Sequence, residues 1–285
     1  MTDTAPSPEI AARLARAKQR SVMICTPVAR NPVYQYTASL ASTLLFLSEQ
    51  GIRCTFQFVV GSSVISKARN ELCAEFLNSD FTDLLFIDDD MEWSPNAVMR
   101  VLASDKPLIG GVGRQRIQKP NSDPAVWCWR PRADGAGGLF QDEMGAIEAL
   151  GFGAAFMLIN RGVLHAMATA HPDWKRPGPK DWPQAKRDNY FEFFRQNHEG
   201  AEGEMSEDYV FCDRWRAMGN SVWVDPTIVL GHVGSWNYQG SIEEAVLVPA
   251  ANSEHAPSAN STNHALEQAR PREPSANSAH CEAAA

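Results

Sequence analysis

The chain has 285 residues, a formal net charge of −8, and 44% hydrophobic and 21% charged residues. These proportions are ordinary for a globular protein, and the length can hold one large domain or two modest ones. A negative balance without a basic stripe argues against a general nucleic-acid or membrane-surface binder. Residues 1–20 lack the apolar core of a secretory signal, and no apolar run reaches the roughly 20 residues that span a bilayer. Six scattered cysteines without a CxxC pair favour a reducing compartment, so we predict a cytoplasmic protein.

The first half of the chain alternates between helix-like and strand-like segments. Helices are indicated by apolar periodicity with serine or proline at the start and glycine at the end, and strands by short apolar or β-branched runs. In chain order, we predict helices over 8–20, 35–51, 62–79 and 94–104, and strands over 21–27, 52–60, 83–88 and 107–113. This alternation predicts an α/β fold with a mostly parallel sheet and helices on both faces.

The second half is less regular. We predict an edge strand at 127–132, an extended apolar segment at 146–160, a helix at 161–170, an ordered flap at 171–204, a helix at 206–220 and one or two strands in 221–234. Serines are the expected N-caps of three of the predicted helices: Ser62 or Ser63, Ser94 and Ser206. The aromatic residues of the flap suit either stacking on a sugar or base or packing in a small core: Trp174, Trp182, Phe191 and Phe193.

The C-terminal segment changes in character from about Val248. Residues 249–285 hold one large aliphatic residue, Leu266, and repeat Ser-Ala-Asn-Ser. Such a segment buries too little apolar area to offset its ordering entropy. We therefore predict a disordered tail over 243–285, outside the functional domain.

Three aspartates, Asp88 to Asp90, directly follow the predicted strand at 83–88. In parallel sheets, ligands bind beyond the carboxyl ends of the strands. Strand geometry can place Asp88 and Asp90 on one side, where their oxygens can bind a hard divalent cation. The alternative is a solvated acidic turn that caps the following helix. The apolar strand before the run and Ser94-Pro95 after it favour the metal site.

Two further positions carry candidate chemistry. Glu207 and Asp208 fall in the first turn of a predicted helix, where they either stabilise its N-terminus or supply a base. His232 lies between Gly231 and Gly234, which suits a metal or phosphate ligand or a structural histidine. Aspartates and a neutral imidazole form a plausible manganese set.

Basic residues near predicted strand ends are candidates for phosphate contacts. Lys67 and Arg69 can hold a phosphate or carboxylate, or form an ordinary charged helix face. Arg30 follows the first strand in a loop suited to a base or phosphate contact. No Walker-type or GxGxxG loop occurs, and the glycines at 110–113 are too few for a phosphate loop.

In chain order, these motifs resemble a GT-A-type nucleotide-sugar glycosyltransferase. The resemblance rests on "TP", "KARNEL", "LLFIDDDMEWSP", "GFGAAFMLINRGVL", "SEDYVFCDRWRAMG" and "HVG". Within this class the motifs resemble those of family-2-like enzymes of bacteria and phages, and the "ARN" helix also resembles fungal Anp1-type mannosyltransferases. The resemblance covers roughly residues 20–235. It implies one GT-A (Rossmann-like) domain over 21–242, with a nucleotide-binding half at 21–115 and an acceptor and metal half at 116–242, after an extension at 1–20.

The resemblance also implies residue roles. Donor contacts fall on Thr26, Pro27, Arg30, Arg69, Asn70, Asp88 and Asp89. Acceptor contacts fall on Gly151, Phe152 and Gly153. A Mn²⁺ or Mg²⁺ ion falls to Asp90, Asp88 and His232, with Asp90 the expected metal contact of the run. In the catalytic pair Glu207 and Asp208, the aspartate is the expected base for the acceptor hydroxyl.

We therefore predict a metal-dependent glycosyltransferase that uses a nucleoside-diphosphate sugar, UDP- or GDP-linked. The acceptor stays open between a glycan, a protein and a modified nucleobase, as does the oligomeric state. A late metal-binding histidine is more familiar in retaining enzymes and an "ED" base in inverting ones, so the stereochemical outcome is also open. The alternatives are a nucleotidyltransferase, against which the glycine-poor "CTPVARNP" argues, and a non-catalytic sugar-nucleotide-binding module.

Overall fold

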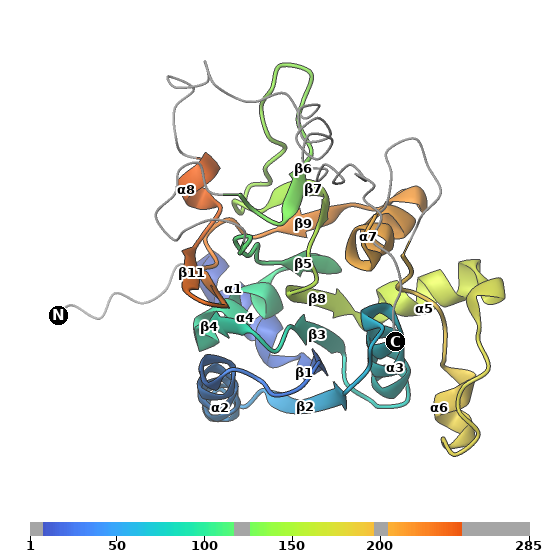
Figure 1. The fold of residues 1–285 in the computed structure, drawn as a ribbon. Helices are drawn as coiled ribbons and strands as arrows, with labels where there is room; N and C mark the ends of the chain where they lie inside the picture. Colours follow the sequence, from blue (N-terminus) through green and yellow to red (C-terminus); the bar gives the residue numbers. More distant parts are fainter. Residues whose placement is uncertain (1–7, 117–125, 197–204, 247–285) are drawn as a thin grey trace, which may run out of the picture. The chain divides into compact units, whose positions relative to one another are not determined.

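The computed structural model describes residues 8–116, 126–196 and 205–246, and these contain one central eight-stranded sheet (Figure 1). In spatial order its strands are β2 (Arg53–Val60), β1 (Ser21–Val28), β3 (Asp83–Ile87), β8 (Phe156–Asn160), β5 (Leu108–Gly110), β9 (Val222–Val224), β7 (Ile147–Phe152) and β6 (Trp129–Pro131). Only β8 and β7 run opposite to the other strands of this sheet. The prediction of a mostly parallel sheet in an α/β fold is confirmed.

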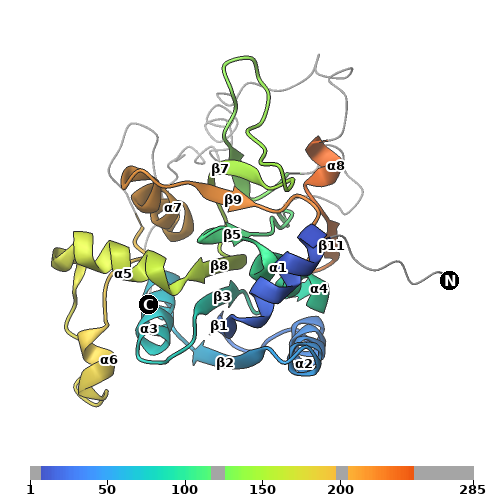
Figure 2. The same ribbon diagram turned by 180° about the vertical axis from the view of Figure 1, so that it is seen from behind.

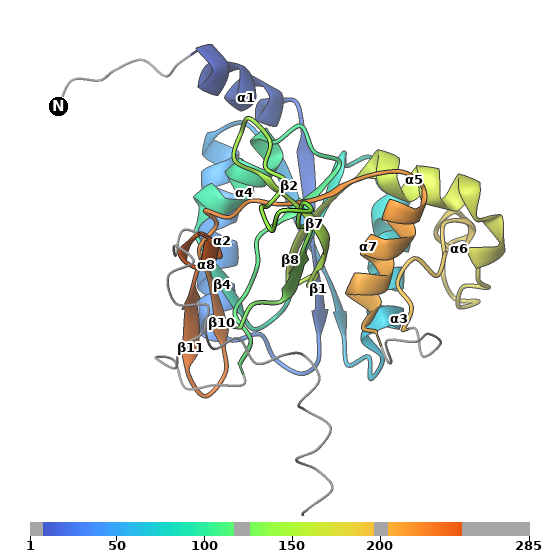
Figure 3. The ribbon, with the colours of Figure 1, turned by 90° about the horizontal axis from the view of Figure 1, so that it is seen from above.

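Helices cover both faces of this sheet, as the sequence predicts (Figures 1, 2 and 3). One face carries α1 (Pro8–Lys18), α2 (Tyr34–Glu49) and α4 (Pro95–Ala103), and the other carries α3 (Ile65–Leu77), α5 (Arg161–Ala170) and α7 (Glu207–Ala217). Because successive strand residues point to opposite faces, each strand serves two cores. In β1, Val22 and Ile24 join the core on the α2 side, whereas Met23 and Cys25 join the core on the α3 side.

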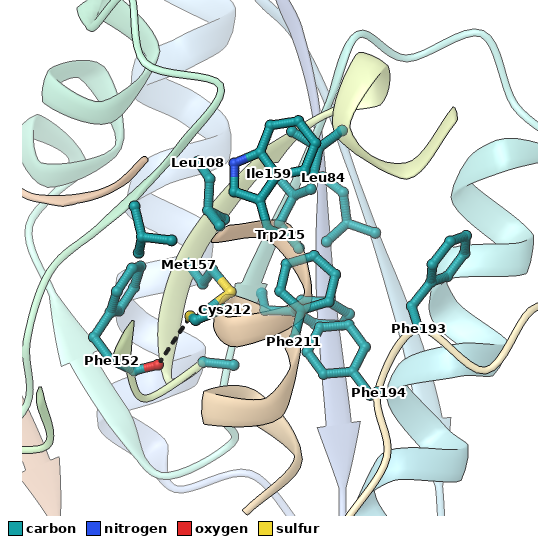
Figure 4. Close-up of a cluster of buried hydrophobic side chains, with 14 of the residues drawn as sticks. Leu84, Leu108, Phe152, Met157, Ile159, Phe193, Phe194, Phe211, Cys212 and Trp215 are labelled. Atoms are coloured by element: carbon teal, nitrogen blue, oxygen red, sulfur yellow. Dashed lines mark hydrogen bonds between the residues drawn. The ribbon is translucent and has the colours of Figure 1, made fainter. Parts of the chain in front are cut away.

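The core on the α3 side is rich in aromatic residues (Figure 4). Phe194 stacks on Phe211 of α7 with ring centroids 4.4 Å apart, and meets Phe86 of β3 edge-on at 5.3 Å. Phe193 is also fully buried in this core. These contacts fix α7 against the sheet, and Phe193 and Phe194 fill the core instead of presenting stacking surfaces.

A second, three-stranded antiparallel sheet forms beside the carboxyl end of β3. It contains β4 (Met91–Trp93), β10 (Leu230–Val233) and β11 (Asn237–Gly240). In its register, His232 lies opposite Met91, the residue after Asp90. The sequence patterns missed β4 and β11, because a three-residue strand next to an acidic run and a polar four-residue strand carry little periodicity. This small sheet brings the predicted late histidine to the aspartates.

Local boundaries differ from the predictions at several points. The segment 146–160 is two strands, β7 and β8, which lie apart in the sheet with β5 and β9 between them. The predicted flap contains the 3-10 turn η1 (Pro172–Trp174) and α6 (Gln184–Asp188). The predicted tail starts too early, because α8 (Glu243–Val246) belongs to one compact unit that ends at Val246. The rest of the predicted tail lies outside the described residues.

The predicted serine caps do not form. Ser94 and Ser206 occupy the N-cap positions of α4 and α7 without a capping hydrogen bond from the side chain. The N-cap of α3 is Val64, so the predicted cap at Ser62 or Ser63 is wrong. Helices α3 and α7 are therefore held by packing and by the charged contacts described below.

Five cysteines fall in the described part of the chain, and all are free: Cys25, Cys54, Cys73, Cys128 and Cys212. Burial raises the pKa of Cys54 to about 12 and that of Cys212 to about 12.

Among the described residues, none of the helices combines the length and apolar character needed to cross a membrane.

Candidate functional site

A cavity of about 340 Å³ opens at the carboxyl ends of β1, β2 and β3. Its lining includes Pro27 near the end of β1 and Ala29 just after it, the run Asp88 to Asp90 after β3, Arg116 and His232. This is the place where parallel sheets bind ligands, since the strand ends and their loops converge there. The structure thus brings together residues that the sequence placed far apart.

A second cavity, of about 490 Å³, lies between α1 and α4 and is less suited to chemistry. Its main charged groups are already matched, since Arg100 makes two hydrogen bonds to Asp225, and Asp142 pairs with Lys106 at 2.8 Å. The cavity at the aspartates is therefore the candidate functional site.

His232 faces Asp90 in this cavity. Its Nδ1 lies 2.7 Å from the carbonyl oxygen of Arg114, which can only accept, so Nδ1–H donates. In the neutral imidazole the lone pair is then on Nε2, which lies 3.5 Å from Oδ1 of Asp90. A histidine oriented by a backbone carbonyl in this way presents its other nitrogen as a ligand.

Asp90 is held from two sides. Its Oδ2 pairs with Arg116 at 2.8 Å, and its carbonyl oxygen accepts from the backbone N–H of Val233 at 2.8 Å. Burial acts to raise the pKa of Asp90, but the protonated form of His232, which donates to Asp90, and the charge of Arg116 outweigh it and hold that pKa below its usual value. Arg116 was missed by the sequence reading. It follows β5 in the chain, and this position after a strand indicates a place near the carboxyl edge of the sheet.

Arg69 of α3 is buried between two carboxylates, with only 2% of it exposed. Its Nε donates to Oε1 of Glu207 at 3.0 Å, and one terminal nitrogen donates to Oδ1 of Asp88 at 3.0 Å. The other terminal nitrogen reaches the carbonyl oxygen of Ala154 at 3.4 Å. One buried guanidinium thus ties α3, the end of β3, the β7–β8 turn and the start of α7 together.

This network changes the roles expected of its members. Burial raises the pKa of Asp88 and of Glu207, and the charge of Arg69 opposes that rise in both. Burial acts to lower the pKa of Arg69, but the two carboxylates outweigh it and raise that pKa. In this structure Glu207 is an ion-pair partner of Arg69, and the guanidinium of Arg69 is occupied by two carboxylates of its own chain. Asp88 lines the cavity but gives one oxygen to Arg69.

Asp208, beside Glu207, is more exposed and differently held. Its Oδ1 accepts from the hydroxyl of Ser206 and from the N–H of Tyr209, and its Oδ2 accepts from the N–H of Ala154 at 3.2 Å. Each carboxylate oxygen has two lone pairs, so these contacts leave one on Oδ2. A Cβ built on Gly153 would lie 3.5 Å from Oδ2 of Asp208. Because glycine has no side chain, the space next to this oxygen stays open. Asp208 is not part of the cavity lining, but its charge acts on Asp88.

Three of the residues expected to touch a donor have internal partners. Thr26 is fully buried, and its hydroxyl lies 2.6 Å from that of Tyr36. Asn70 exchanges hydrogen bonds with the backbone of Phe194, at 2.9 and 2.8 Å. Asp89 lines the cavity but accepts from the N–H of Ala29 at 3.1 Å, which joins the loops after β1 and β3. The side chains of Thr26 and Asn70 hold the fold, because neither reaches the cavity.

The remaining predicted positions divide between the site and the core. Pro27 lines the cavity, whereas Arg30 is exposed and does not. Of the expected acceptor loop, Phe152 is fully buried, and a Cβ on Gly151 would lie 3.0 Å from the ring of Tyr209. Only Gly153 lies beside a candidate catalytic group. Gly151 and Phe152 are explained by packing.

The glycines at 110–113 also have a packing role. A Cβ on Gly110 would come within 2.1 Å of the carbonyl oxygen of Phe156 and 2.4 Å of the ring of Phe152. Gly110 is therefore required for the close approach of β5 and β8. This agrees with the prediction that residues 110–113 do not form a phosphate loop.

Fold and site together define an α/β protein with an acidic cavity at the carboxyl edge of its sheet. No protein-family model matches the chain, and no curated protein matches it significantly. The functional argument therefore rests on the geometry of the site.

Proposed function

We propose that the protein is a metal-dependent glycosyltransferase of GT-A type, which moves a sugar from a UDP- or GDP-linked donor to an acceptor hydroxyl. The observation that supports this best is the convergence of Asp90 Oδ1 and His232 Nε2, 3.5 Å apart, in a cavity at the carboxyl ends of β1 and β3. A nucleotide-sugar donor needs its diphosphate charge neutralised, and an aspartate–imidazole pair in such a cavity suits a cation that does this.

The residues present fit a manganese or magnesium ion in part. Carboxylate oxygen and imidazole nitrogen are suitable ligands, and the hydrogen bond to Arg114 orients the imidazole. Among the described residues, no group of three or more His, Cys, Asp or Glu side chains is arranged to hold a metal ion. In the proposal the ion would be held by Asp90 and His232 and by donor phosphate oxygens, and it would stabilise the departing diphosphate.

In the proposed transfer step, Asp208 acts as the base. Its Oδ2 accepts the proton of the acceptor hydroxyl while that oxygen bonds to the anomeric carbon of the sugar. The bond from that carbon to the diphosphate breaks, and the nucleoside diphosphate leaves. The support is geometric: Ala154 and Ser206 orient the carboxylate, and Gly153 leaves room before Oδ2. Arg69 fixes the β7–β8 turn through the carbonyl of Ala154, so it positions the base without touching substrate.

A panel of nucleotide-sugars tests the class directly. We expect thermal stabilisation by one UDP- or GDP-sugar in the presence of manganese, and a much smaller effect without it, since binding to the folded state alone raises stability. Stabilisation by nucleoside triphosphates alone would instead favour a nucleotidyltransferase. No response to any member of the panel would contradict the proposal.

The proposed ligand pair gives a sharper test. Asp90→Asn and His232→Ala should each weaken manganese-dependent binding of UDP or GDP at least about tenfold, because each removes one of two protein ligands. Isothermal titration calorimetry with and without manganese measures this. Asp105→Asn and His165→Ala, both at exposed positions away from the cavity, are the matched controls and should leave binding unchanged. If all four variants bound UDP or GDP with the same dependence on manganese, the proposed metal site would be contradicted.

A further inference from the structure

Strand β2 forms one end of the eight-stranded sheet. All eight of its residues, Arg53 to Val60, pair with β1 in parallel. In the described part of the chain no strand pairs with its other edge, and Figures 1 and 2 show β2 as the last strand on that side. At about 3.3 Å per residue, this edge presents roughly 26 Å of unpaired backbone donors and acceptors.

This edge lacks the features that normally prevent strand pairing. Free edges in monomeric proteins are usually interrupted by charges, prolines or bulges. Residues 54–60, "CTFQFVV", contain no charged residue, proline or glycine. The register with β1 advances without a shift from Arg53 to Val60. The edge is therefore long, regular and uncharged over most of its length.

Apolar side chains at the edge are exposed as well. Phe56 is 44% exposed and Val60 64% exposed. Phe56 lies against Phe58 with ring centroids 5.2 Å apart, so its ring is supported on one side and open on the other. Single exposed apolar residues are ordinary, but here they accompany a free backbone edge.

We propose that β2 pairs antiparallel with β2 of a second copy of this chain, across a two-fold axis. Such a contact uses the same surface on both copies and closes at two subunits. The charge pattern of the strand is compatible with a second copy, because its one charged residue, Arg53, lies at its start and bonds to Asp80 within its own chain, while residues 54–60 are uncharged. Antiparallel pairing places the two Arg53 side chains at opposite ends of the shared edge, so that no like charges face each other. The central sheet then continues through both subunits.

This dimer is independent of the proposed function. The cavity opens at the carboxyl end of β2, where Val59 lines it. In an antiparallel pair the two carboxyl ends point in opposite directions, so the two cavities lie at opposite ends of the shared edge. Loss of the dimer should therefore leave nucleotide binding in place, and loss of binding should leave the dimer.

The oligomeric state of the full-length protein tests the proposal. By size-exclusion chromatography with light scattering at micromolar concentration, we expect twice the chain mass of 31.4 kDa. Phe56→Lys and Gln57→Lys each place a charge on the edge and should give the monomer mass, because a charge on an edge strand blocks pairing. Val229→Lys changes an exposed apolar residue outside the edge (55% against 44% for Phe56) and should remain a dimer.

Folding is checked by circular dichroism, and Gln57→Lys guards against misfolding of Phe56→Lys because Gln57 is exposed. A monomeric wild-type protein would overturn the proposal, as would a dimer that persists in folded Gln57→Lys. Association beyond two subunits would also overturn it, since the two-fold contact is closed.

Discussion

Replacing Arg69 by methionine should lower the free energy of unfolding by about 3–5 kcal/mol, because it leaves the buried Glu207 and the partly buried Asp88 without their cation. Arg69 is 2% exposed and lies 3.0 Å from both Asp88 and Glu207, so solvent cannot replace its charge. Urea unfolding at neutral pH, followed by circular dichroism, measures the change. It is the largest stability effect that we expect from a single substitution in this protein.

The defect should also depend on pH in a defined direction. Burial raises the pKa of Glu207 and of Asp88, and Arg69 opposes the rise, so removing Arg69 raises both further. A carboxyl whose folded pKa exceeds its unfolded pKa stabilises the fold below the unfolded pKa, and this stabilisation is lost as the pH rises through the folded pKa. The difference between Arg69→Met and wild type should therefore be greatest at neutral pH and shrink towards about pH 5.

Two further variants separate the buried network from a general effect of losing charge. Lys67→Met on the same helix removes an exposed cation that lies 3.8 Å from Glu71 and should change stability by less than about 0.5 kcal/mol. Adding Glu207→Gln to Arg69→Met removes one orphaned charge and should recover part of the loss. Equal stability of Arg69→Met and Lys67→Met would contradict the network.

The sequence predicts the elements of this fold well where periodicity is local. The first three strands, their helices and the position of Asp88 to Asp90 at a carboxyl end follow from apolar runs of the right length and from helix ends. The arrangement of the later strands does not follow. Strand β8 enters antiparallel between β3 and β5, and that position depends on packing such as the contact of Gly110 with Phe156, not on any pattern within β8.

The residues of the candidate site also differ in how well the sequence predicts them. Asp90 and His232 could be predicted because a strand end and a glycine-flanked histidine are visible locally, and the structure brings them together. Arg69 and Glu207 were read as separate functional groups, although each satisfies the other. Which opposite charge a buried residue meets is decided by tertiary contacts between distant segments. For this reason the residue types were predicted more reliably than their partners.

Changing Asp208 to asparagine should reduce sugar transfer by roughly 10²- to 10⁴-fold and leave donor binding intact. The amide oxygen of asparagine can still accept from the N–H of Ala154, as Oδ2 does now, whereas its NH₂ group, in the place of Oδ1, can donate to the hydroxyl of Ser206 but cannot accept from the N–H of Tyr209. The amide cannot take up the proton of an acceptor hydroxyl. The rate is measured as nucleoside diphosphate released from the donor that the panel identifies, and binding by calorimetry.

The matched control lies on the same helix. Asp213 pairs with Arg130 at 3.0 Å and with Arg216 at 3.4 Å, and it has no place in the cavity or in the proposed transfer. Asp213→Asn should therefore keep its transfer rate, even if removing these partly exposed ion pairs costs up to about 1 kcal/mol of stability. A fall in kcat in Asp208→Asn alone, with an unchanged dissociation constant for the donor, identifies a group that acts in the chemical step. Full transfer by Asp208→Asn would mean that this carboxylate, held by Ser206 and Ala154, only secures the start of α7 against the β7–β8 turn.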